Sequence, residues 1–151
     1  MMGIDNIKKS ARSLGACEKI ESINSISQAI ELMFSPQGRE FALKTDYPYL
    51  DVWRENKDAV RDIHGIYIDT KNIVVSNHNV IAVGDAEVRV TLSETDRLYH
   101  IIAMHGAKIK LYVKNYAVAT VTSVKATIEI FKDSTAAIDI ENTGIVRREY
   151  I

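Results

Sequence analysis

The sequence has little of the residue types that cross-link or interrupt a chain. A single cysteine, Cys17, stands among 151 residues, which excludes an internal disulfide and a zinc site built from cysteines. Only two prolines occur and none follows Pro48, so no later strand is interrupted by proline. The seven glycines are scattered, which excludes a glycine-rich phosphate loop. A chain of this length can fold by packing alone, and we expect a cytoplasmic location.

Charge of one sign and long apolar runs are also lacking. The formal net charge is -1, and basic and acidic side chains balance in both halves of the chain. A nucleic-acid surface normally carries a basic excess, so we expect no nucleic-acid partner. No run of apolar residues is long enough to cross a bilayer, and Lys8 and Lys9 are followed by a polar stretch rather than by a signal-peptide core. We therefore expect no membrane partner either.

The first 63 residues have helical periodicity, with apolar residues at steps of three and four. We expect short helices that bury one stripe each. They are predicted to run from Asp5 to about Leu14, from Cys17 or Ser25 to Phe34, from Pro36 through Leu43, and from an Asp51 cap toward Ile63. This segment is predicted to form a helical head.

From His64 onward β-branched residues dominate, and a five-residue pattern, Ala-x-apolar-x-apolar, recurs about every ten residues. A degenerate copy without its alanine fits at Asp96–His100. Such a period indicates one β unit stacked on itself. The complete copies begin at Ala86, Ala107, Ala117, Ala126 and Ala136.

The alternation within each unit predicts which side chains face inward, because residues two apart share one face of a strand. The apolar pairs are predicted to fill the interior, and the residues between them to face solvent. The inward pairs are Val88/Val90, Ile109/Leu111, Ala119/Val121, Ile128/Ile130 and Ile138/Ile140.

Two architectures share this pattern: a solenoid of parallel strands, and an antiparallel meander or sandwich. Tight hairpins favour Asn-Gly or Asp-Gly, and neither occurs between the units. The sequence therefore predicts an α+β protein with an N-terminal helical cap followed by a short single-stranded β-solenoid, with the meander or sandwich as the alternative. We expect a head at 1–63, a β-repeat body at 64–142 and a tail at 143–151. Whether one or two units make one coil stays open.

Three stretches, Glu31–Phe41, Tyr49–Arg54 and Ile102–Ala107, together with the Ala-led repeats, resemble uncharacterised prophage or mobile-element proteins of gut anaerobes. The resemblance covers about residues 30–140. It implies the same layout of helical head and β repeats and a phage or mobile-element context. It implies no activity and no site residue.

Carboxylates are the one hint of catalysis. Glu129 and Asp139 occupy the same outward position of successive units. If one unit makes one coil, they lie close enough to act as the paired acids of a glycosidase; if two units make one coil, they lie on opposite sides. The simpler interpretation is that both carboxylates belong to a solvated outer face of the repeat.

Other outward residues are candidates for binding. An outward ladder of Arg89, Tyr99, Lys110, Thr120, Glu129 and Asp139 could contact a polymer or a neighbouring subunit. Tyr49 and Trp53, in an aromatic patch beside Pro48, could stack on a sugar or anchor a partner. His100 and His105 lie an odd number of residues apart, so a regular strand directs them to opposite faces. We expect no metal site and no cofactor.

A regular repeat without a convergent polar cluster predicts a non-enzymatic structural or binding module that acts through its β surface or its open end. The expected partner is another protein or a second copy paired along the solenoid edge, and a glycan is possible. The alternatives are a carbohydrate-active hydrolase with paired acids, and a regulatory or immunity-type partner protein.

Overall fold

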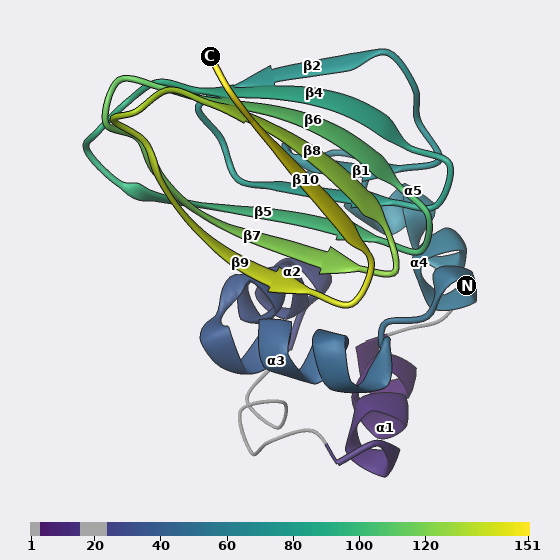
Figure 1. The fold of residues 1–151 in the computed structure, drawn as a ribbon. Coiled ribbons are helices and arrows are strands. Elements are labelled where there is room, and N and C mark those ends of the chain that lie inside the picture. Colours follow the sequence, from purple (N-terminus) through teal and green to yellow (C-terminus); the bar gives the residue numbers. More distant parts are fainter. Residues whose placement is uncertain (1–3, 16–23) are drawn as a thin grey trace. The chain divides into compact units, whose positions relative to one another are not determined.

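The computed structural model of this protein describes residues 4–15 and 24–151 (Figure 1). The chain divides into two compact units, Met1–His64 and Gly65–Ile151. The described part of the first unit is helical, and the second consists of parallel β-strands wound into a solenoid. The fold is therefore α+β with a β-solenoid, as the sequence predicts.

Two serines begin the middle helices of the first unit. The Ser25 hydroxyl accepts a hydrogen bond from the Gln28 N–H, and the Ser35 hydroxyl accepts one from the Gly38 N–H. Each bond satisfies an N–H that has no partner within its helix. The helices are α1 (Ile4–Ser13), α2 (Ile26–Phe34), α3 (Pro36–Thr45), α4 (Leu50–Glu55) and α5 (Lys57–Val60).

The structure decides between the two predicted starts of the second helix and moves the start of the fourth helix. Of the two starts proposed for the second helix, Ser25 is the cap of α2, and Cys17 lies outside the described residues. The fourth helix begins one residue before Asp51, so its N-cap is Tyr49 and Asp51 lies in its first turn. The Asp51 carboxylate accepts from the Val52 N–H instead of capping from outside the helix.

The solenoid consists of two five-stranded sheets, and every strand pair in both of them is parallel. This pairing excludes the antiparallel meander. Sheet A has the order β1-β3-β5-β7-β9, and sheet B has the order β10-β8-β6-β4-β2. The strands are β1 (Ile66–Ile68), β2 (Ile73–Ser76), β3 (Val80–Val83), β4 (Glu87–Leu92), β5 (Leu98–Met104), β6 (Lys108–Val113), β7 (Val118–Val124), β8 (Thr127–Lys132), β9 (Ala137–Asn142) and β10 (Ile145–Tyr150).

Each coil therefore takes two units, one strand in each sheet (Figure 1). Short connections join the two strands of a coil, so the chain runs out along sheet A and returns along sheet B. The structure answers the question that the repeat leaves open. Successive Ala-led units lie in opposite sheets, and a unit has its register neighbour two units further along the chain.

Aliphatic side chains form continuous columns inside the solenoid. Val90, Leu111 and Ile130 are register neighbours in sheet B, and each is fully buried. Four of the five pairs predicted to face inward are buried in this core, and the fifth, Ile138/Ile140, packs against it and is half-buried. The alanines that begin the units are buried in it too, at the corners where the coil changes sheet. Burial of each aliphatic side chain contributes about 1.5–3 kcal/mol, so the columns are the main source of stability.

Polar side chains in the turns bond to the backbone of the next coil. The Asn77 Oδ1 accepts from the Ser93 N–H at 2.8 Å, and the Asn79 Oδ1 accepts from the His100 N–H at 2.9 Å. Asn77 has a positive φ of 53°, which asparagine tolerates better than most residues. These bonds connect the Asn77 and Asn79 side chains to the coil that follows.

Asp133 accepts hydrogen bonds from two adjacent turns. Its carboxylate accepts from the Thr135 hydroxyl, from the N–H groups of Thr135 and Ala136, and from the Asn115 N–H of the preceding coil. The Thr135 hydroxyl and these N–H groups lower the pKa of Asp133 below its ordinary value, against a smaller opposing effect of desolvation. The carboxylate thus holds two adjacent turns together in its charged form.

We expect Asp133→Ala to lower the melting temperature at neutral pH, because it leaves these donors without their acceptor. The folded pKa is lower than the unfolded one, so the charge-dependent stabilisation is complete above the unfolded pKa of about 3.9. It is lost as the pH falls through the folded pKa. The gap between wild type and variant in thermal melts should therefore narrow in acid. An equal gap at all pH values, or an equal loss in the control Glu87→Ala, would contradict this role.

Candidate binding surfaces

The two carboxylates considered as paired acids lie in different sheets. Glu129 is on β8 in sheet B and Asp139 is on β9 in sheet A, and both occupy outward positions. The interior of the solenoid separates them, so they cannot flank one glycosidic bond. The structure does not bring the pair together, because a coil takes two units rather than one.

The predicted outward ladder divides between the two sheets for the same reason. Arg89, Lys110 and Glu129 form one outward column of sheet B, which continues to Arg147. Thr120 and Asp139 are neighbours in sheet A. No single face therefore carries the whole ladder.

Tyr99 does not belong to either outward column. It points into the core, and none of its surface is exposed. The degenerate repeat is offset by one residue from the frame Asp96–His100, because Tyr99 and Ala119 are register partners in β5 and β7. Arg97 therefore occupies the position of the missing alanine, and the prediction that Tyr99 faces outward is wrong.

The predicted aromatic patch is only partly accessible to solvent. The Trp53 side chain is only 4% exposed, whereas Tyr49 is 41% exposed. The Tyr49 ring packs edge-on against Tyr47, with 5.3 Å between the ring centroids. Of the two, only Tyr49 is exposed enough to contact a large partner. Trp53 lines a cavity within the helical unit.

The histidines make local contacts rather than a metal cluster. His100 Nδ1 lies 2.7 Å from the Thr120 hydroxyl on the adjacent strand, which links two coils of sheet A. His105 lies in the turn after β5 with a positive φ. Within residues 4–15 and 24–151, no three histidine, cysteine or acidic side chains gather as a metal site would need.

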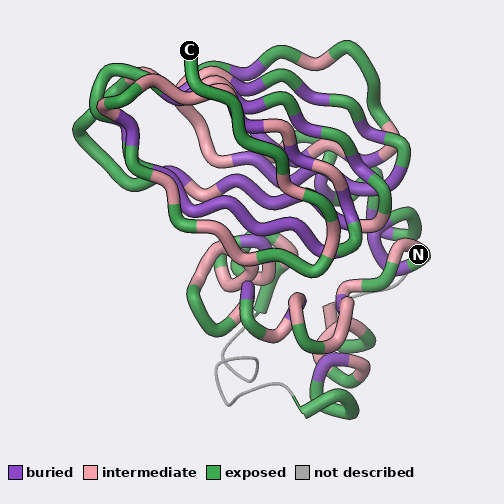
Figure 2. The backbone as a smooth tube through the Cα atoms, viewed as in Figure 1, coloured by how far each residue is buried: buried purple, intermediate pink, exposed green. Residues whose placement is uncertain are grey.

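The last coil is the most exposed part of the solenoid. The segment predicted as a tail contains strand β10, which pairs with β8 and is exposed along most of its length (Figure 2). In the described residues, β9 and β10 each have a strand neighbour on one side only. Ile145, Tyr150 and Ile151 are exposed large hydrophobic residues on or beside β10. We call the free edges of β9 and β10, with their side chains, the open end.

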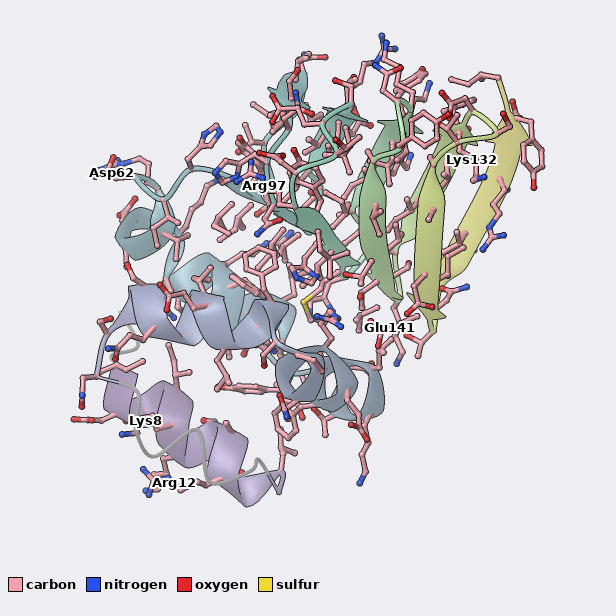
Figure 3. All side chains as sticks on the ribbon, turned by 90° about the vertical axis from the view of Figure 1, so that its left-hand side faces the viewer. Lys8, Arg12, Asp62, Arg97, Lys132 and Glu141 are labelled. Carbon is pink, nitrogen blue, oxygen red and sulfur yellow. The ribbon has the colours of Figure 1, made fainter. Side chains whose placement is uncertain are left out.

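The open end carries separated charges. Strand β9 presents two carboxylates, Asp139 and Glu141, on its outward face (Figure 3 labels Glu141). Strand β10 presents Arg147 and Glu149 on its outward face, and Arg148 follows Ile130 in the inward column. An arginine in that column has solvent beyond it instead of a further aliphatic layer. The acidic strand β9 therefore ends sheet A, and β10, with two arginines and one glutamate, ends sheet B.

Comparisons of this chain with protein-family models, with curated proteins and with solved structures find no match. The part of the chain that the structure describes contains no helix with the length and apolar character needed to cross a membrane.

Proposed function

We propose that this protein is a non-enzymatic binding module that associates with a second copy of itself through the open end. The observation that carries the proposal is the pair of free strand edges with opposite charge. Unpaired N–H and C=O groups along an edge strand are a template for a further strand. Here β9 has two carboxylates, whereas β10 has a net positive charge from Arg147 and Arg148 against Glu149, so the two edges complement each other between copies.

A twofold axis parallel to the strands satisfies this complementarity. Such an axis places sheet A of one copy against sheet B of the other, so that β9 lies beside the second copy's β10. Because β9 and β10 run in opposite directions, the new strand pairs are antiparallel. Two identical pairs form, and the symmetric contact closes as a dimer without growing into a fibre.

The new pairs form contacts on both faces. On the outside, Asp139 and Glu141 of one copy approach Arg147 of the other, which shares its face with Glu149. On the inside, the half-buried Ile138, Ile140 and Val146 gain apolar contacts beside the inward Arg148. The contact combines backbone hydrogen bonds, apolar burial and charge complementarity, which together fix its orientation.

The test uses two charge-reversed variants and sedimentation equilibrium. Arg147→Glu/Arg148→Glu makes both edges acidic, and Asp139→Arg/Glu141→Arg makes both edges basic. Each variant alone should dimerise at least about tenfold more weakly than wild type, since like charges in contact cost several kcal/mol. An equimolar mixture of the two should form a heterodimer, because each acidic edge then meets a basic one.

The matched control is Arg89→Glu/Lys110→Glu, which reverses two outward charges on β4 and β6, away from the open end. It should dimerise as wild type does. A wild-type protein that stays monomeric at high micromolar concentration would overturn the proposal. So would a mixture of correctly folded variants that remains monomeric. The prophage or mobile-element context stays a prediction, and genomic neighbours would test it.

A further inference from the structure

The helical unit contains a cavity of about 300 Å³. All of its lining residues lie between Ile7 and Val60, and its walls are mainly aliphatic and aromatic. Small-molecule pockets have volumes that begin near this value and are lined in the same way. The walls come from α1 to α5 and include Ile7, Ala11, Ala29, Phe41, Val52 and Trp53.

Gly38 helps to set the shape of this cavity. A Cβ atom at this position would lie 1.9 Å from the Leu32 carbonyl oxygen, so only glycine permits the close approach of α2 and α3. The two helices are joined directly by Ser35, whose hydroxyl also donates to the Leu32 carbonyl at 2.6 Å. The connection holds the helices at a fixed spacing, and the cavity is thus part of the fold of this unit.

Two residues of the cavity lining, Trp53 and Asn56, are only 4% exposed. Each has one buried polar atom that finds no hydrogen-bond partner among the described residues: the Trp53 Nε1, a donor, and the Asn56 Oδ1, an acceptor. The orientation of the Asn56 amide is fixed chemically, because its Nδ2 donates to the Val52 carbonyl at 2.8 Å. A buried polar group without a hydrogen-bond partner is unfavourable, so two of them in residues that line one cavity indicate a function.

The two residues are three positions apart at the end of α4, so they occupy the same side of that helix. Together they offer one donor and one acceptor against apolar walls. A hydroxyl group satisfies both atoms at once, since its oxygen accepts from Trp53 and its hydrogen is donated to Asn56. A carboxylate would satisfy the first atom only and would bring a negative charge to the second.

We propose that the helical unit binds a small apolar molecule that carries one neutral hydroxyl group. Its apolar part fills the space between the helices, and its hydroxyl group bonds to Trp53 and Asn56. This site is separate from the open end, so it does not depend on self-association. Trp53 is the only tryptophan of the chain, which makes its fluorescence a direct probe of the cavity.

The test titrates the full chain with three probes of equal chain length: octanol, octane and octanoate. Octanol should change the Trp53 emission in a saturable way and raise the melting temperature of the helical unit. It should bind at least about tenfold more tightly than octane or octanoate, since only octanol pairs both buried polar atoms. Equal affinity for octanol and octane, or no saturable change with octanol, would overturn the proposal.

Two variants separate the site from general stability. Asn56→Leu removes the acceptor while keeping a similar volume, so it should reduce the preference for octanol over octane about tenfold. Ala29→Phe fills the cavity, so it should abolish the octanol response and keep or raise the melting temperature. The control Tyr49→Phe, outside the cavity lining, should behave as wild type. Unchanged octanol binding in a folded Ala29→Phe protein would contradict the assigned site.

Discussion

Leu111→Ala should destabilise the solenoid unit by about 2–5 kcal/mol, the range for truncation of a fully buried leucine. Leu111 lies on β6, the middle strand of sheet B, and none of its surface is exposed. Its register neighbours are Val90 and Ile130, one coil away on either side. The truncation therefore opens a cavity that both neighbouring coils share.

The stacked architecture increases the consequence of this loss. A coil contacts only its two neighbours, so the stability of the unit is approximately a sum of coil terms and interface terms. The central strand contributes to interfaces on both sides, and no distant part of the unit can compensate for it. Urea unfolding followed by the β-sheet circular dichroism signal should show a lower midpoint for Leu111→Ala.

Lys110→Ala is the matched control, because Lys110 is adjacent in sequence but points outward and is exposed. It should change the free energy of unfolding by no more than about 0.5 kcal/mol, as is usual for a surface site. A loss at Lys110 equal to or larger than the loss at Leu111 would mean that the faces of β6 are reversed. The assignment of side chains to the core columns would then be wrong.

The β repeat could be predicted from the sequence because each of its units obeys one simple rule. Alternation in Ala107–Leu111 and in its copies identifies the inward side chains, and the scarcity of tight-turn dipeptides favours a solenoid over hairpins. The structure confirms both predictions. Local periodicity is sufficient for most of the Ala-led units because their strands have one apolar and one polar face.

The same rule fails where a strand is apolar on both faces or where its frame is degenerate. The run Val80–Val83 is buried throughout, so alternation does not indicate its inward face. In β5 the replacement of alanine by Arg97 concealed the frame, and Tyr99 was assigned to the wrong side as a result. Only the register with Ala119 on β7 shows its orientation, and register is a long-range property.

The candidate sites were harder to predict because each combines residues from distant parts of the chain. The sequences around Asp139 and Arg147 look like those of ordinary surface strands. The charges of these two residues become complementary only because β9 and β10 end two different sheets. Residues of five helices line the cavity beside Trp53. The Asn56 Oδ1 is left without a partner because the amide donates its Nδ2 to the Val52 carbonyl. Sequence reasoning identified Trp53 as an aromatic of interest but could not show that its N–H group is buried without a partner.

Engineered disulfides test the winding of the chain most directly. Lys110 and Glu129 are register neighbours on β6 and β8, whereas Glu129 and Asp139 belong to successive units in opposite sheets. Neighbouring strands place paired Cα atoms within the 4.4–6.8 Å that a disulfide requires, and opposite sheets are about 10 Å apart. The experiment places each cysteine pair in a chain whose single natural cysteine, Cys17, is replaced by serine.

The decisive measurement is the fraction of intramolecular disulfide that each pair forms on mild oxidation, by peptide mass analysis of the monomer. If each coil takes two units, Lys110→Cys/Glu129→Cys should close almost completely, with a gain in stability of about 3 kcal/mol for a loop of this length. Glu129→Cys/Asp139→Cys should hardly close at all. The reverse pattern would show that successive units lie side by side, and it would contradict the two-sheet solenoid and its open end.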